Sequence, residues 1–559
     1  MKKYYTIGVD FGTLTARGVL VDVSNGEEKA VSIFGYQDAV IDRTLPEYNT
    51  ALPSEYALQN PEDYEAALEG ILKDLWRKAE IDPSCVVGIG IDFTSCTIMP
   101  LDEKMTPLCL APAFRGNKHS WPKLWKHHSA QKQANRINET ARRRGEAFIR
   151  RYGGTSSCEW LFAKVLEILE EAPEVYAATH RFVEAADWIF YLLTGELKKS
   201  SVPAGFKAFW SKDQGYPSKE FFKELDPALE NVIEEKIGTE VFPIGEYAGR
   251  LSRHMSEITG LPEGISVALG NIDAHSSFPA AGATEDSSML MIMGTSLCHI
   301  LISSKEVFID GISGVVKDGV MPGYFGYEAG QAAVGDIYDW FVSNLLPSEF
   351  LEEVQRRNIN VFDLINEKMA LIKPGASGLL ALDWWNGNRS LLVNSDLSGL
   401  IIGMTLTTAP EEIYRALVEA TAFGSRMIIE EFERRGVPVS RVYACGGLSV
   451  KSPEIMQIFA DIIGKPIMIS SAGQTSALGA AIYGAAAAGR AKGGYDSVFE
   501  AVEHMVTPPG TVYAPNKANE SIYNRLYEQY VLLHDFFGRG GSDIMQTLKY
   551  IKNSCAAAD

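Results

Sequence analysis

The chain is poor in the features that mark secreted, membrane-spanning and nucleic-acid-binding proteins. Its seven cysteines form no close pairs, which argues against a disulfide framework and against a zinc ribbon. No apolar run reaches the length of a membrane-spanning helix, about 20 residues. No lysine- or arginine-rich cluster stands out against a formal net charge of −19, so we expect neither nucleic acid nor a membrane as a partner.

The first residues, MKKYYTIGVDFG, lack the apolar stretch of a signal peptide, and scattered cysteines suit a reducing compartment. We therefore expect a cytoplasmic protein. With 559 residues, 46% of them apolar and 22% charged, the chain has the composition of a globular protein and the length of two or more domains.

Two segments about half the chain apart share one pattern, in which a Gly-Thr turn joins two strands. The first segment is 5–23, with its turn at Gly12 and Thr13, and the second is 289–302, with its turn at Gly294 and Thr295. A dinucleotide fingerprint or a Walker loop needs a helix directly after the glycines, and neither segment has one. The repeat predicts two related α/β halves that adjoin near residue 280, with chance recurrence of a common dipeptide as the alternative.

Other strands and helices follow from hydrophobic periodicity and capping residues. We expect strands at 86–93, 266–272 and 441–445, and helices at 159–170, 185–193, 413–434 and 453–463. Ser452 is the expected capping residue of the last helix. A further helix at 477–489 consists almost wholly of small residues, which indicates either tight packing on a sheet or contact with a ligand.

Two acids follow strands at positions where open sheets bind ligands. Asp10 precedes the first glycine turn, and a carboxylate beside a phosphate needs a cation between them, so Asp10 is a candidate ligand of Mg²⁺. Asp273 follows a strand just before the second half, where it would accept the proton of an attacking hydroxyl. The alternatives are a turn-capping aspartate at Asp10 and a helix cap at Asp273.

Three glycine turns offer backbone N–H groups to a nucleotide. Gly12 and Thr13 would approach a phosphate from one side, and Gly294 and Thr295 from the other. A third turn, Gly446-Gly447, stands between a strand and a helix and suits an adenosine moiety.

Several polar residues allow two interpretations each. Lys207 lies among aromatics and would bind a sugar oxygen or extend to water from an apolar surface. Glu328 and Gln331 stand in a glycine-flanked polar segment with the same ambiguity. The segment 383–389, DWWNGNR, is typical of carbohydrate sites and equally of a core. The histidines, His127 and His128 included, lack metal-ligand spacing and are expected at the surface.

Taken together, these motifs resemble the FGGY carbohydrate kinases. The segment GGLSVKSPEIMQIFADIIGKPI matches the C-terminal signature of that family through Gly447, Ser449, Gln457, Ala460, Asp461, Gly464 and Pro466. In the N-terminal signature, SSCEWLFAKVLEILEEAPEVY keeps Lys164, but Glu167 stands where a tryptophan is usual.

Within the family the chain is similar to the L-ribulokinase group, from residue 5 to about residue 515. The similar motifs are IGVDFGTLTARGVLVDV, LPSEYALQNPEDY, GIDFTSCTIMP, LWKHHSAQ, RYGGTSSCEW, VEAADWI, GNIDAH, MIMGTSLCH, GYEAGQAAVGDIYDWFV and LLALDWWNGNRS.

The resemblance implies two duplicated actin/hexokinase-like (ribonuclease H-like) α/β domains with a catalytic cleft between them. Residues 1–282 would bind the sugar and carry the general base, and residues 283–559 would bind the nucleotide. The implied reaction, with ATP and Mg²⁺, is phosphorylation of L-ribulose at the 5-hydroxyl to L-ribulose 5-phosphate in arabinose breakdown.

The resemblance also implies roles for individual residues. Asp273 resembles the general base and Asp10 the magnesium-associated acid. The implied sugar contacts are Ser95, Cys96, Lys207, Asp273 and Glu328, and ribulokinases often carry alanine where Ser95 stands. The implied nucleotide contacts are Gly12, Thr13, Gly294, Thr295, Gly446 and Gly447.

Two alternatives remain open at the level of the sequence. A related kinase would act on another ketopentose or a polyol, such as D-ribulose, xylulose or ribitol. An actin-like filament or chaperone ATPase would share the fold but would need no Asp–Lys–Glu set for a sugar. The number of subunits is open as well, with a homodimer as one option.

Overall fold

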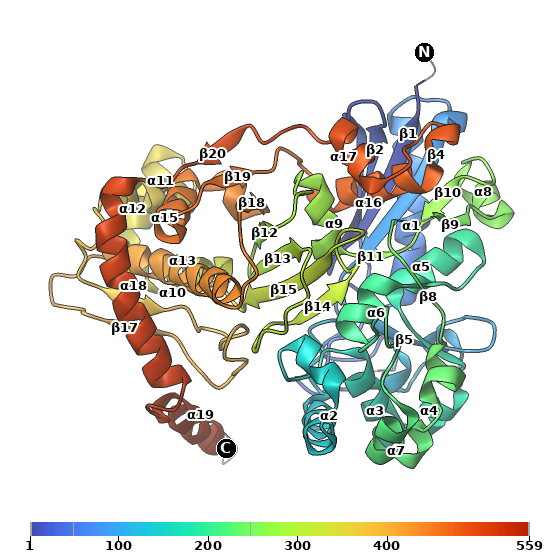
Figure 1. Ribbon diagram of the computed structural model, residues 1–559, viewed down its shortest axis with the longest axis horizontal. Helices are drawn as coiled ribbons and strands as arrows, with labels where there is room; N and C mark the ends of the chain where they lie inside the picture. Colours follow the sequence, from blue (N-terminus) through green and yellow to red (C-terminus); the bar gives the residue numbers. More distant parts are fainter. Residues whose placement is uncertain (1–2, 49, 246, 557–559) are drawn as a thin grey trace.

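Two mixed β-sheets form the frame of the molecule and lie next to each other, with helices around them (Figure 1). The structure is a computed structural model that describes residues 3–48, 50–245 and 247–556. The strands of the first sheet are β1 Tyr5–Phe11, β2 Thr15–Asp22, β3 Glu28–Gly35, β4 Val86–Phe93, β9 Tyr247–Arg250, β10 Ser266–Ala268 and β11 Asn271–Ile272. Those of the second are β12 Ser288–Met293, β13 Leu297–Ser303, β14 Gly314–Lys317, β15 Phe325–Gln331, β18 Arg441–Cys445, β19 Ile467–Ile469 and β20 Thr511–Tyr513.

The two sheets repeat one topology. The first has the order β3-β2-β1-β4-β10-β9, with β11 also on β4, and the second has β14-β15-β13-β12-β18-β19-β20. In each, a Gly-Thr hairpin supplies an antiparallel pair, and the first strand of that hairpin pairs in parallel with a later buried strand, β4 or β18. The predicted duplication is therefore confirmed.

Helices cover both sheets and also form a separate group below the first sheet in Figure 1. The helices are α1 Pro61–Lys78, α2 Gln131–Arg144, α3 Leu161–Glu171, α4 Pro173–Ala178, α5 Ala185–Thr194, α6 Ser201–Lys207, α7 Lys219–Leu225, α8 Arg253–Thr259, α9 Asp273–Ala280, α10 Gly335–Leu345, α11 Ser348–Arg357, α12 Val361–Ala370, α13 Pro410–Arg434, α14 Gly447–Lys451, α15 Pro453–Ile463, α16 Thr475–Ala488, α17 Val498–Met505, α18 Lys517–Gly538 and α19 Ile544–Ala556. The remaining short strands are β5 Ile98–Leu101, β6 Arg181–Glu184, β7 Lys199–Ser200, β8 Val241–Phe242, β16 Leu380–Leu382 and β17 Leu400–Ile402. None of the described helices is both long and apolar enough to cross a membrane.

Each sheet has its own apolar core, and a third core joins α2, α3 and α7 with their neighbours. Helix α16 comes from the second half of the sequence but packs on β1 and β4 of the first sheet. The division at residues 282 and 283 stays a prediction, and residues 1–2 and 557–559 at its outer ends lie outside the described part.

The small residues of α16 let it lie directly on the sheet. A Cβ atom added to Gly8 would lie 1.8 Å from the carbonyl oxygen of Ala477, and one added to Gly90 would lie 1.8 Å from that of Ala480. Both neighbours are backbone atoms, so no side-chain rotation relieves the overlap. Of the two interpretations of this helix, tight helix–sheet packing is therefore the one that the structure supports.

We expect Gly90→Ala to lower the free energy of unfolding by about 1–3 kcal/mol, because the new methyl group forces α16 away from the sheet. Urea unfolding followed by circular dichroism measures the change. Gly35→Ala is the matched control, since a Cβ atom at this strand end meets no atom within 4 Å. Equal stability of the two variants would contradict the close approach.

Two local predictions need correction. The strand expected at 266–272 is interrupted, because Gly270 is pressed against the backbone of Ala186, where an added Cβ would lie 2.9 Å from its carbonyl oxygen. Ser452 holds the position before α15, but its side chain makes no capping hydrogen bond to the helix. The other predicted strands and helices are present, with ends that differ by up to three residues.

Candidate active site

Three carboxylates meet where strands of the first sheet end. Asp10 on β1 is the register partner of Asp92 on β4, and Asp92 in turn is the partner of Asn271 on β11. Asp273 follows β11 directly and is the first residue of α9. Because these strands run parallel, their carboxyl ends lie at one edge of the sheet, and the three acids gather there.

Burial and mutual repulsion disfavour the charged forms of these acids. The pKa of Asp273 is raised to about 7, chiefly by burial and then by the neighbouring Asp10. The pKa of Asp92 is raised well above its ordinary value by burial and by Asp10. Burial also raises the pKa of Asp10, although Asp92 and Arg17 act in the opposite direction. A cation at this place would remove the repulsion.

The donor set fits a magnesium ion that arrives with a nucleotide. Neither carboxylate oxygen of Asp92 has a hydrogen-bond partner among the described residues. No group of three His, Cys, Asp or Glu side chains in the described part is placed to hold a metal ion. Mg²⁺ in phosphotransfer sites is commonly held by one or two carboxylates together with water and phosphate oxygens, so Asp10 and Asp92 suffice for that scheme.

Lys207 and Glu328 form a buried ion pair that joins the two halves. The Nζ atom of Lys207, at the end of α6, lies 2.9 Å from each carboxylate oxygen of Glu328 on β15. His275 Nε2 lies 3.4 Å from the same carboxylate. Burial raises the pKa of Glu328, but Lys207 and His275 lower it by more, so the carboxylate stays charged. The interpretation of Lys207 as extending to water is wrong, because its side chain is 5% exposed.

The Ser95-Cys96 turn follows β4 and lies near Lys207, which acts electrostatically on the Cys96 thiol. Cys96 has a φ of 64°, a backbone conformation that side-chain-bearing residues rarely adopt. The buried Nζ of Lys164 donates to the carbonyl of Cys96 at 2.7 Å and to that of Leu124 at 2.9 Å. The lysine of the N-terminal signature therefore holds this turn in place.

Two glycine turns lie side by side at the ends of β12 and β18. A Cβ atom on Gly446, whose φ is 95°, would lie 2.5 Å from the carbonyl oxygen of Met293, directly before Gly294. Backbone N–H groups at the start of α10 donate to the carbonyl of Thr295. Gly447 and the Thr295 side chain are exposed, and no atom lies within 4 Å of a Cβ added to Gly447. These turns are thus firmly held and open to a ligand.

The first glycine turn is tied to the segment before α1 and to the loop that follows β5. Thr13 accepts two hydrogen bonds: its hydroxyl oxygen from Trp125 Nε1 at 3.1 Å, and its carbonyl oxygen from Gln59 Nε2 at 2.8 Å. The N–H of Gly12 donates to the carbonyl of Thr15. The Thr13 hydroxyl keeps its own hydrogen for a ligand, whereas the N–H of Gly12 is already used within the turn.

The histidine prediction is right for His128, which is exposed, and wrong for His127, which is fully buried. It is also wrong for His119, His299 and His534, which are buried. His127 belongs to a charged cluster in the helical core, where Lys123 Nζ lies 2.9 Å and His127 Nε2 lies 3.2 Å from Glu167. All three side chains are completely inaccessible to solvent. The carboxylate that replaces the usual tryptophan of the signature is therefore paired with Lys123, and it also meets His127 of the LWKHHSAQ motif.

The polar side chains of Gln331 and Asp383 are used in hydrogen bonds within the protein. Gln331 Nε2 donates to Asp383 and to the carbonyl of Thr421, and the hydroxyl of Tyr530 also donates to Asp383. Trp384 is buried in the core of the second sheet. Of the DWWNGNR segment, Arg389 comes close to the predicted sugar contacts, since Glu328 and Cys96 act on it electrostatically.

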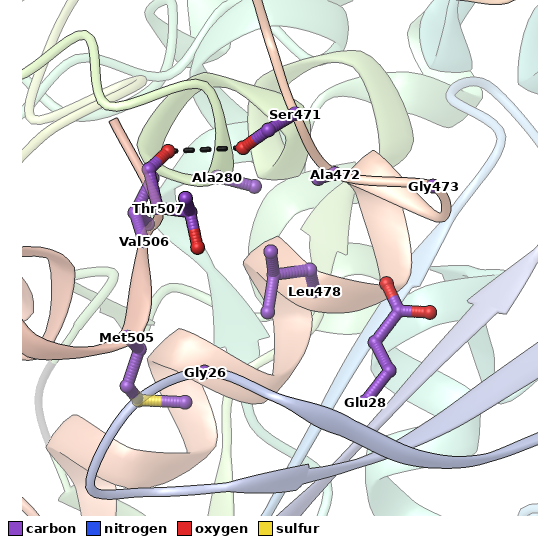
Figure 2. A pocket seen from close by; sticks show the side chains of 10 residues that line it. All are labelled: Gly26, Glu28, Ala280, Ser471, Ala472, Gly473, Leu478, Met505, Val506 and Thr507. Atoms are coloured by element: carbon purple, nitrogen blue, oxygen red, sulfur yellow. Dashed lines mark hydrogen bonds between the residues drawn. The ribbon is translucent and has the colours of Figure 1, made fainter. Parts of the chain in front are cut away.

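A separate pocket of about 280 Å³ contains none of the predicted site residues (Figure 2). It lies between the turn after β2, the end of α9 and the loop that leads into α16. Leu478 and Met505 supply apolar atoms, and Ser471 donates a hydrogen bond across it to the carbonyl of Thr507. No charged group other than Glu28 lines it, so we assign it no role in the chemistry.

Sequence analysis missed Asp92 and Arg389 as members of the site. The signal for Asp92 was available, because it ends a buried strand as Asp10 does. Arg389 was named only as part of the DWWNGNR segment, because the folded chain, and not the local pattern, brings it to β15.

The two sheets repeat one topology. Acids lie at the strand ends of the first sheet, and open glycine turns lie at the strand ends of the second. This combination defines a two-domain phosphotransferase. Over residues 5–278 the sequence matches the N-terminal domain of the FGGY family of carbohydrate kinases, and over residues 289–488 it matches the C-terminal domain. The chain belongs to this family.

Curated relatives match over nearly their whole length. The chain is 51% identical to a protein named ribulokinase from Halalkalibacterium halodurans over 99% of this chain and 98% of that one. It is 48% identical to a ribulokinase from Geobacillus thermodenitrificans over 100% and 99% of the two chains. Among solved structures, a xylulose kinase from Rhodospirillum rubrum has a TM-score of 0.77 at 22% identity, covering 95% of this chain and 98% of that one, which shows the fold.

Proposed function

We propose that the protein transfers the terminal phosphoryl group of ATP to the 5-hydroxyl of L-ribulose, giving L-ribulose 5-phosphate and ADP, as a step of L-arabinose breakdown. The ribulokinases among its relatives support this substrate. The observation that carries the proposal is the position of Asp273, near both Asp10 and the Lys207–Glu328 pair, with a pKa matched to the task of a base at neutral pH.

In this proposal the sugar lies against the Ser95-Cys96 turn and the Lys207–Glu328 pair. Asp273 accepts the proton of the 5-hydroxyl as that oxygen attacks the phosphoryl group. The turns at Gly12–Thr13, Gly294–Thr295 and Gly446–Gly447 hold the nucleotide. Asp10 and Asp92 would hold Mg²⁺, which supplies charge neutralisation at the phosphates when bound.

Positioning accounts for most of the catalysis under this mechanism, because the transition state of phosphoryl transfer is loose. The residues that fix positions are Lys164 behind the Cys96 turn and Trp125 beside Thr13. A cytoplasmic location and a homodimer remain predictions. Light scattering of the purified protein measures the number of subunits.

The test of the function is ADP release by the purified protein with Mg-ATP. The acceptors to compare are L-ribulose, D-ribulose, D-xylulose, L-xylulose, ribitol, glycerol and no sugar. The highest kcat/KM on L-ribulose is the expected result. A clear preference for another acceptor would overturn the substrate, and ADP release that ignores every sugar would overturn the kinase reaction.

The pH dependence of kcat/KM for the sugar should report Asp273. Its raised pKa of about 7 means that a base is lost as pH falls, so activity should decline below neutral pH and level off above it. Asp10 and Glu328 raise this pKa, while Lys207 and the N–H of Ala274 lower it. Bound Mg²⁺ favours the carboxylate, so saturating Mg-ATP should move the midpoint downward. A flat profile from about pH 8 to about pH 5 would contradict the assignment.

A further inference from the structure

The segment 385–394 brings one charged side chain, that of Arg389, to the junction of the two halves. The backbone N–H of Gly330 on β15 donates to the hydroxyl of Ser390 at 3.2 Å, which fixes the segment on the strand. The Arg389 stem then fills the space above Gly330, since an added Cβ there would lie 3.4 Å from Arg389 Cδ and 3.6 Å from Nη1.

Arg389 lies on the same face of β15 as Glu328. Side chains two positions apart on a strand point to the same side, and Gly330 follows Glu328 by two. Cys298 on β13 is the register partner of Gly330 and is partly exposed. Glu159, from the helical group of the first half, acts on Arg389 electrostatically as well. The guanidinium is therefore surrounded by residues of both halves.

The acids around Arg389 are already paired with other groups. Both oxygens of Glu328 are bound by Lys207, and Glu159 Oε1 lies 3.3 Å from His128 Nε2. Among the described residues Arg389 itself has neither a hydrogen bond nor an ion pair. A largely enclosed guanidinium with five N–H donors is costly unless acceptors meet it, and a polyhydroxy ketone supplies such acceptors.

The positions of Asp273, Glu328 and Arg389 indicate which end of the sugar lies beside Arg389. The charges that act on the pKa of Asp273 include Asp10, Glu328 and Lys207. Those that act on the pKa of Arg389 are Cys298, Glu159, Glu328 and Cys96. Glu328 acts on both groups, whereas neither Asp273 nor Arg389 is among the main charges that act on the other, so the guanidinium is placed nearer to Glu328 than to the base. With the 5-hydroxyl at Asp273, the opposite end of a five-carbon chain extends past Glu328.

We propose that Arg389 binds the ketone end of the acceptor and donates N–H bonds to the oxygens on C1 and C2. The inference rests on the proposed function. The planar fork of a guanidinium suits two oxygens on neighbouring atoms better than an ammonium does. Arg389 thereby contributes to acceptor specificity at the end of the sugar that is opposite the reacting 5-hydroxyl.

The test compares L-ribulose with 1-deoxy-L-ribulose, which lacks one of the two oxygens, in wild type, Arg389→Gln and Arg389→Lys. We expect Arg389→Gln to raise KM for L-ribulose by about tenfold to a hundredfold, with a smaller change in kcat, because bonds from a charged donor are lost. The wild-type preference for L-ribulose over the 1-deoxy sugar should shrink toward one in this variant. Arg389→Lys should lie between, since it keeps the charge without the fork.

Asn386→Ala, an exposed change in the same segment, is the matched control and should behave as wild type. ADP binding and the melting temperature should be the same in all the variants. If Arg389→Gln keeps the wild-type KM for L-ribulose and the wild-type preference between the two sugars, the inference is overturned. If Arg389→Gln does not fold, the same result in Arg389→Lys overturns it. A wild type that uses both sugars equally would also overturn it, whereas a wild type inactive on every sugar would overturn the proposed function itself.

Discussion

Replacing Asp273 by asparagine should lower kcat by about 10²–10⁴-fold while the fold and nucleotide binding persist. The amide has nearly the shape of the carboxylate but cannot accept the proton of the attacking hydroxyl. The raised pKa of Asp273 means that its ionisation is unfavourable in the folded protein, so the variant should be at least as stable as wild type near neutral pH. Steady-state kinetics, ADP binding and thermal unfolding measure the three properties.

Asp310→Asn is the matched control for this variant, because its side chain is 86% exposed and lies outside the site. It should retain wild-type turnover. Near-normal turnover of Asp273→Asn would remove Asp273 from the role of base. If Asp273→Asn instead lowers the melting temperature as much as a substitution in the apolar core does, the main role of the carboxylate is to stabilise the N-terminus of α9.

Replacing Lys123 by methionine should lower the free energy of unfolding by about 3–5 kcal/mol, since the change leaves Glu167 as a charge without its main partner in the helical core. Burial raises the pKa of Glu167, and Lys123 is the largest of the effects that lower it. Urea unfolding, followed by the fluorescence of the tryptophans, measures the loss.

Two further variants test whether the loss of stability in Lys123→Met comes from the buried charge of Glu167. Arg253→Met breaks a surface pair with Glu257, whose partners are 80% and 65% exposed, and should cost less than about 1 kcal/mol. Adding Glu167→Gln to Lys123→Met should recover part of the loss, because the uncompensated charge is gone. A loss from Lys123→Met no larger than that of the surface pair would contradict a buried, charged cluster.

Much of the fold could be predicted from local patterns in the chain. Alternating apolar residues around a Gly-Thr turn predicted both hairpins, because the strand period and the turn chemistry act over a few residues. The strand at 441–445 matches β18, and Gly464 ends α15 as expected. The strand at 266–272 failed for a non-local reason, namely the contact of Gly270 with Ala186 in α5.

The site was only partly predictable, because its contacts join distant segments. Asp10 and Asp273 were found from their places after strands, while Asp92 was overlooked although it follows the same rule. The pairing of Lys207 with Glu328 spans 121 residues, and nothing in either segment indicates the other. The histidine prediction failed at His127, because the absence of metal-ligand spacing says nothing about burial beside Glu167.

The sequence by itself determined the duplicated α/β architecture, the family and the glycine turns, since these depend on short-range periodicity and on motifs that stay together in the chain. Only the tertiary structure decided that α16 packs on the first sheet, that Glu167 is paired with Lys123 and meets His127, and that Arg389 reaches the junction of the halves. Each of these depends on how far-separated segments close on one another, where packing and desolvation decide the partner and no local pattern records it.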